Sequence, residues 1–152
     1  PTLANAKRKA RRVKCVSNLK QIGTAFISFA GNNMGNLQWQ LTPESKKKNF
    51  GSVFANEPNV IFSGKFMKST LGSAEILYSP CDSYRKLANA EADANWRNYS
   101  LKNPISKKAI SYVLIEGADV ARTTTVLAAT RNLSTCDIAT ARWVGTFSKG
   151  LN

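Results

Sequence analysis

The sequence predicts an α+β domain in which a long N-terminal helix packs on a small antiparallel sheet, with irregular loops and one or two short helices. Residues 3–30 contain no proline and no glycine before Gly23, which favours one long helix. β-branched residues gather in the last third of the chain, which favours strands there. The 152 residues are enough for one hydrophobic core. We therefore expect an N-terminal helix, residues 1–30, and a globular α+β domain, residues 31–152.

The predicted helix has two halves of different character. Residues 15–30 place apolar side chains at steps of three and four, which predicts a half that docks on the domain. Gly23 and Ala30 lie beside this stripe and are small enough to let another element approach. The stripe consists of Cys15, Leu19, Ile22, Phe26 and Phe29. Residues 1–14 form a basic arm that we expect to project from the domain, and its cations are Lys7, Arg8, Lys9, Arg11, Arg12 and Lys14.

The rest of the chain is predicted from turn residues and local periodicity. Residues 31–36 are a helix stop rich in glycine and asparagine. We expect an irregular loop over 37–50 with Trp39 against the domain, a short helix and turn over 53–71, a strand over 75–78, and a helix over 83–96 capped by Asp82. Further strands are predicted at 110–115, 123–130 and 141–147.

The charge of +13 is high for a chain of this length. Such a charge attracts nucleic acid, anionic lipid headgroups or acidic polysaccharide. The simpler interpretation is a solubilising surface with one membrane-flanking cluster. We favour it because no aromatic residues are interleaved with the cations, as single-strand binders require.

The composition argues against an enzyme. The chain contains no histidine, which removes the commonest general base, most zinc sites and every Ser-His or Cys-His pair. The carboxylates are scattered and no glycine-rich phosphate loop is present. We predict a non-catalytic protein with no cofactor and no metal site.

The three cysteines lack metal-ligand spacing. Cys15 falls on the apolar stripe and is predicted to lie in the core. Cys81 and Cys136 both lie in polar, loop-like contexts, so one disulfide between them is a candidate, worth about 4 kcal/mol in the chain-entropy model. The alternative is three reduced thiols.

The chain has no apolar run of 18 or more residues and no visible signal peptide. It opens inside a helical pattern at Pro1, which either is a first-turn residue or follows a segment that has been removed. The basic arm favours removal, because cationic flanks commonly follow a hydrophobic span.

Residues 15–23, with the sequence CVSNLKQIG, resemble the segment that follows the hydrophobic span in bacterial type IV pilin-like proteins and type II secretion pseudopilins. This family carries a prepilin-type cleavage and methylation leader, and the likeness is greatest to the sets found in Verrucomicrobia and Planctomycetes. Further matches, weak singly but in the same order along the chain, are residues 3–7, 76–82 with Arg85, 110–113 and 124–133.

The resemblance implies an upstream apolar helix that anchors the subunit in the inner membrane. After leader cleavage, such subunits polymerise with copies of themselves or other pilins, with their helices in the filament core. The arm would then lie just outside the bilayer or between subunits. Leu19, Ile22, Phe26 and Phe29 would form a dry seam between helix and sheet. The implied location is the cell envelope, as inner-membrane, periplasmic or extracellular filament.

Two departures from the family are visible. The leader and the apolar span, with the glutamate that usually registers subunits, are absent, which suggests a trimmed or processed chain. The chain also stops at Asn152, where family members typically continue into further strands, so an exposed sheet edge is expected.

The expected function is that of a structural filament subunit which assembles through its N-terminal helix. The alternative, from a different class, is a polyanion-binding module that holds DNA with the basic arm. The two can coexist, and they differ in salt dependence because phosphate binding weakens steeply with salt.

Overall fold

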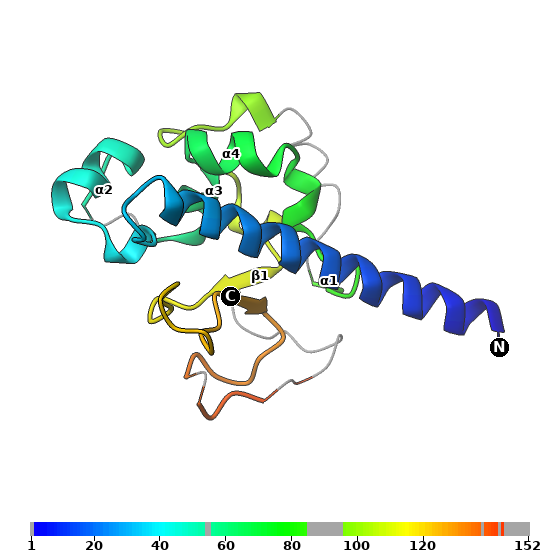
Figure 1. The fold of residues 1–152 in the computed structure, drawn as a ribbon. Helices are drawn as coiled ribbons and strands as arrows, with labels where there is room; N and C mark the ends of the chain where they lie inside the picture. The colour runs from blue at the N-terminus through cyan, green and yellow to red at the C-terminus, as the bar shows by residue number, and fades with distance from the viewer. Residues whose placement is uncertain (1, 54–55, 85–95, 138, 143, 145–152) are drawn as a thin grey trace.

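The structure is a computed structural model that describes residues 2–53, 56–84, 96–137, 139–142 and 144. It has a long N-terminal helix, several short helices and a small antiparallel sheet (Figure 1). The α-helices are α1 (Thr2–Gly31), α2 (Pro43–Phe50), α3 (Pro58–Ser63) and α4 (Lys65–Leu71). The 3₁₀ helices are η1 (Gln38–Gln40), η2 (Ala74–Leu77), η3 (Trp96–Asn98) and η4 (Lys107–Ala109), and the strands are β1 (Tyr112–Leu114) and β2 (Ala128–Thr130). This confirms the α+β class.

Helix α1 is continuous over 30 residues, about 45 Å at 1.5 Å per residue. All side chains from residue 2 to residue 14 are exposed, and Cys15 is the first buried one. The predicted helix stop is confirmed: the N–H of Gly35, a residue with φ of +83°, donates to the carbonyl of Ala30 at 2.8 Å. The first turns of α1 therefore extend beyond the globular body (Figure 1).

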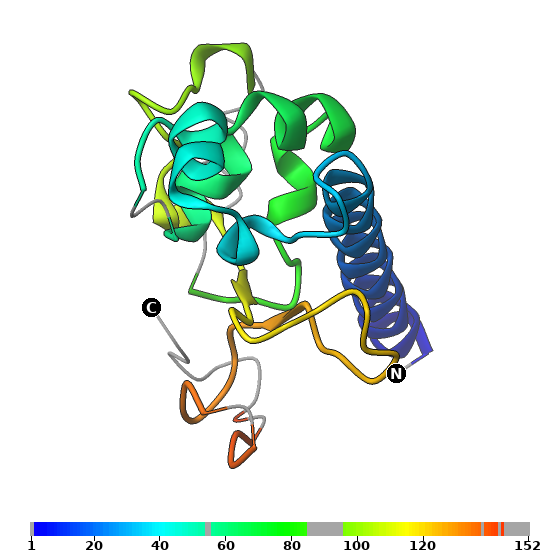
Figure 2. The ribbon, with the colours of Figure 1, turned by 60° about the vertical axis from the view of Figure 1, so that its left-hand side comes forward.

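The docked half of α1 contacts more helix than sheet. The Phe26 ring lies 6.0 Å from Phe62 of α3, edge to face, and Phe29 lies 5.5 Å from Phe66 of α4. Helix α1 contacts α4, η2 and β2 (Figure 2). The predicted helix-on-sheet packing is therefore corrected, since aromatic side chains of α3 and α4 form much of the surface that α1 covers.

The described strands form a two-stranded antiparallel sheet in which Tyr112 pairs with Thr130 and Leu114 with Ala128. The strands predicted at 110–115 and 123–130 are present but shorter. The Thr125 hydroxyl accepts a hydrogen bond from the Asp119 N–H at 3.0 Å. Residues 119–125 therefore form a turn, in which a threonine hydroxyl takes up a backbone donor locally.

Two other predictions are wrong because capping residues define short helices in these segments. The predicted strand at 75–78 is the 3₁₀ helix η2, whose first turn is capped by the Ser73 hydroxyl accepting from the Glu75 N–H at 3.2 Å. The predicted loop over 37–50 contains α2. Thr42 caps that helix at its N-terminus, Pro43 occupies its first turn, and Gly51 with φ of +71° ends it.

Residues 53–71 hold two short helices, where the sequence predicted one. Gly64 separates α3 from α4, and a Cβ there would lie 3.2 Å from both the Ile61 carbonyl oxygen and the Phe50 ring. The predicted helix over 83–96 lies mainly outside the described residues, as does much of the strand over 141–147. Within the described part of that strand, the Val144 N–H donates to the Asn132 carbonyl at 3.0 Å.

Candidate functional site

The predicted docking residues of α1 lie where the apolar stripe placed them, with one exception. Cys15, Ile22, Phe26 and Phe29 are buried, and Leu19 is half-buried against the same core. Gly23 is different, because a Cβ at this position would meet nothing within 4 Å. It follows Ile22 and therefore points about 100° away from it around the helix. No described element of the chain uses the small size of Gly23.

Asn18 is a docking residue that the sequence analysis missed. Its side-chain amide is buried and donates to the Tyr78 carbonyl at 2.9 Å and to the Tyr112 hydroxyl at 3.2 Å. Burial raises the pKa of Tyr112 above its ordinary value. The burial of Asn18 could have been predicted from its position. It follows Cys15 by three residues and precedes Ile22 by four, and that spacing places it on the buried face.

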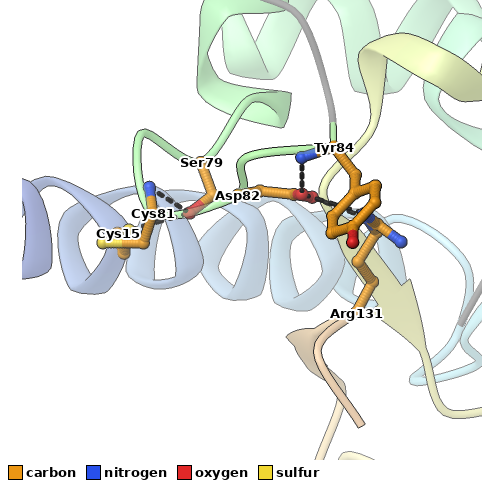
Figure 3. A network of polar contacts seen from close by, with 6 residues as sticks. All are labelled: Cys15, Ser79, Cys81, Asp82, Tyr84 and Arg131. Carbon is orange, nitrogen blue, oxygen red and sulfur yellow. Dashed lines mark hydrogen bonds and ion pairs between the residues drawn. The ribbon is translucent and has the colours of Figure 1, made fainter. Parts of the chain in front are cut away.

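Asp82 and Arg131 form a buried ion pair that also escaped prediction (Figure 3). Nε and Nη2 of Arg131 donate to the two carboxylate oxygens at 2.6 and 2.9 Å. The Tyr84 N–H donates to the same carboxylate at 3.1 Å, and the Arg131 guanidinium carbon lies 5.8 Å from the centre of the Tyr84 ring. The pair joins the segment after η2 to the end of β2.

The sequence left two alternatives for the cysteines, a Cys81–Cys136 disulfide or three reduced thiols. All three are free thiols, so the Cys81–Cys136 disulfide is absent. Cys136 is exposed, whereas Cys81 is half-buried, and its N–H donates to the Ser79 hydroxyl, which lies 2.9 Å from the sulfur of Cys15 on α1. Burial, followed by the effect of the Cys15 thiol, raises the pKa of Cys81 to about 11, although nearby Arg11 and Arg12 act to lower it.

The arm exposes all six predicted cations: Lys7, Arg8, Lys9, Arg11, Arg12 and Lys14. Arg8 donates to the Asn5 side chain at 2.5 Å, and both line a shallow hollow with Lys9 and Arg12. In the described part of the chain, ion pairs join Lys107 to Glu57 and Arg131 to Asp82, and neither involves the arm. At 100° per residue, every arm cation except Lys9 lies within about 80° of the Ile22 direction. Most of the arm charge therefore continues the docked side of the helix.

The outer face of α1 carries exposed apolar side chains instead. Val13, Val16 and Ile27 are 62%, 66% and 59% exposed. They fall within a strip about 60° wide, on the side of the helix away from Ile22. Lys9 and Lys20 lie on the same side of the helix. We call the three apolar residues alone, Val13, Val16 and Ile27, the outer strip.

The described residues contain no group of three or more histidine, cysteine or acidic side chains placed to hold a metal ion. Among them, no helix is both long and apolar enough to cross a membrane. The arrangement thus offers contact surfaces on α1, a buried ion pair and a pair of neighbouring thiols.

A comparison of the chain with protein-family models found no match. Comparisons with curated proteins and with solved structures also found none.

Proposed function

We propose that this chain is a structural, non-catalytic subunit of a type IV pilus-like or type II secretion-like filament in the bacterial cell envelope. The outer strip on α1 carries this proposal. Its valines and isoleucine are about 60% exposed on a helix whose opposite face is already fixed to the domain. Apolar side chains in a strip along a helix are suited to packing against another helix. The contacting partner is a neighbouring subunit of the same kind.

The way α1 is held supports assembly through this helix. The buried rings of Phe26 and Phe29 and the hydrogen bonds of Asn18 fix its docked half. Because α1 is one continuous helix, the same contacts set the direction of the arm. The outer strip would then face a neighbouring subunit in a fixed orientation. The resemblance of residues 15–23 to the pilin segment after the apolar span points to the same use, with an upstream helix in the inner membrane.

The proposal is tested by changing the outer strip in protein produced by its natural cells. Val16→Ser combined with Ile27→Ser should leave the domain folded, because both side chains are exposed, and should abolish thin filaments in negative-stain images. Met34→Ser is the matched control, since Met34 is 97% exposed in the loop that follows the helix. Filaments should persist in the control. Equal filament numbers in the double variant, or a monodisperse monomer from the unchanged gene, would overturn the proposal.

A second candidate function is polyanion binding by the arm, and the distribution of its cations supports it. Five of the six lie on one side of the helix, and in the described part of the chain none has a carboxylate partner. If all six contact phosphates, the logarithm of DNA affinity should fall with the logarithm of salt concentration with a slope of roughly −5. A slope near zero would exclude this function.

A further inference from the structure

Two thiols lie together at the point where α1 leaves the domain. Cys15 is on the helix and Cys81 follows η2 by four residues. The Ser79 hydroxyl lies 2.9 Å from the Cys15 sulfur and accepts a hydrogen bond from the Cys81 N–H at 3.2 Å. Ser79 therefore contacts both cysteines, one through its sulfur and the other through its backbone. Figure 3 shows both cysteines beside Ser79.

The position of this pair gives it a structural consequence. Cys15 is the first buried residue of α1, and every side chain from residue 2 to residue 14 is exposed. The hydrogen bonds that hold the helix at this end are therefore Cys15 with Ser79, followed one turn later by Asn18 with Tyr78 and Tyr112. A covalent bond here would join the helix to the domain at the edge of the contact surface, where it would otherwise separate first.

We propose that Cys15 and Cys81 are a redox pair that forms a disulfide, and that this bond fastens α1 to the domain. The oxidant is a second disulfide, either a small molecule or another protein. The Cys81 thiolate attacks it and displaces one thiolate, which leaves a mixed disulfide on Cys81. The Cys15 thiol then loses its proton and displaces the second thiolate. In total, one disulfide is reduced to two thiols, and the chain loses two hydrogens as the Cys15–Cys81 bond forms.

The surroundings affect the rate of this exchange. Thiolate, and not thiol, is the attacking species. Burial keeps Cys81 largely protonated at neutral pH, while Arg11 and Arg12 favour its thiolate. The exchange should therefore be slow at neutral pH and faster in mild alkali. In a filament, the Cys15–Cys81 disulfide would resist separation of helix and domain under tension, and this use of the bond rests on the proposed function. The formation of the bond does not depend on that function.

The test uses the full chain incubated with oxidised glutathione at pH 8.5. Remaining thiols are then alkylated in denaturant and the protein is digested with trypsin. Cleavage after lysine and arginine places the three cysteines in separate peptides, residues 15–20, 69–85 and 132–142. The expected product links peptides 15–20 and 69–85, with a mass two hydrogens lower than the sum of the separate peptides. A linkage of 69–85 to 132–142, or full alkylation of both Cys15 and Cys81, would overturn the proposal.

A pair of variants tests whether the bond fastens the helix. Cys136→Ser should still form the bond, and oxidation should raise its melting temperature by roughly 10 °C, as expected for closing a loop of this length in a chain of this size. Cys81→Ser should show no such rise. Equal melting temperatures for oxidised and reduced Cys136→Ser would contradict the fastening role. Both measurements use monomeric protein, so their failure is distinguishable from failure of filament assembly.

Discussion

At the scale of single residues, the buried ion pair of Asp82 and Arg131 gives a specific prediction about the free energy of unfolding. Asp82→Asn removes the negative charge and leaves the Arg131 guanidinium buried, because that side chain is only 2% exposed. Breaking a buried ion pair from one side costs about 3–5 kcal/mol. Urea denaturation of the variant should show a loss of this size in the free energy of unfolding.

The matched control for this prediction is the exposed ion pair between Lys107 and Glu57, whose side chains are 59% and 57% exposed. Glu57→Gln should cost less than about 1 kcal/mol, since water already screens both groups. Similar losses in the two variants would mean that Arg131 finds another way to be solvated.

Tyr112 makes stability depend on alkaline pH. Burial raises its pKa above the ordinary value of 10.0, so the unfolded chain releases the phenolic proton at a lower pH than the folded chain. The stabilisation of the folded state that comes from the protonated Tyr112 side chain is complete below about pH 9. It is lost as pH rises through the folded-state pKa. Tyr112→Phe should therefore weaken the fall in the free energy of unfolding between pH 9 and 11, measured by urea denaturation. Identical pH dependence in the variant and the unchanged protein would contradict the assignment.

The residue scale also shows where prediction from sequence ends. The burial of Ile22, Phe26 and Phe29 is readable from spacing, because residues three and four apart share a helix face. The partners of Asp82 and Cys15 are not, since the contacting residues are 49 and more than 60 positions away along the chain. Only the packing of η2 against α1 and the sheet brings them together. Cys81 therefore has Cys15 as its neighbour, and the polar contexts of Cys81 and Cys136 gave no sign of this.

At the scale of elements, Gly23 lies in the docked half of α1 but on the same side of the helix as the outer strip. It lies seven residues after Val16 and four before Ile27, so all three share one side of the helix. Gly23→Ala should raise the free energy of unfolding of the monomer by about 0.5–1 kcal/mol, because glycine is costly in a helix interior and the Cβ meets no atom within 4 Å. If subunits approach each other at this position, the same variant should form fewer filaments. Denaturation and negative-stain imaging measure the two effects.

Gly72→Ala is the control for this substitution. Its Cβ would also meet nothing within 4 Å, but φ is +74°, a conformation that alanine adopts at a cost. That variant should lose about 1 kcal/mol or more. A destabilised Gly23→Ala monomer would show that the outer side of α1 is more crowded than the structure indicates.

The elements differ in how readily the sequence predicts them. Helix α1 and its stop were predictable because apolar periodicity and the glycine-asparagine turn agree. Helix α2 was not, because its lysine-rich sequence has no apolar period, and its capping signals at Thr42, Pro43 and Gly51 define it instead. The packing of α1 on α3 and α4 could not be predicted in this way. Periodicity predicts which face of α1 is buried, but it does not predict which elements cover that face.

At the scale of the whole molecule, the charge of +13 sets opposite salt responses for the two functions. Subunits that pack through the outer strip bring like-charged arms together, and their repulsion is screened beyond about 8 Å at 0.15 M salt. Raising sodium chloride from 50 to 500 mM should therefore increase the sedimentable, filamentous fraction. DNA binding by six arm cations should instead fall at least about a thousandfold between 50 and 200 mM. Filaments that dissociate as salt rises would show that attraction by the arm, and not apolar packing, holds the subunits together.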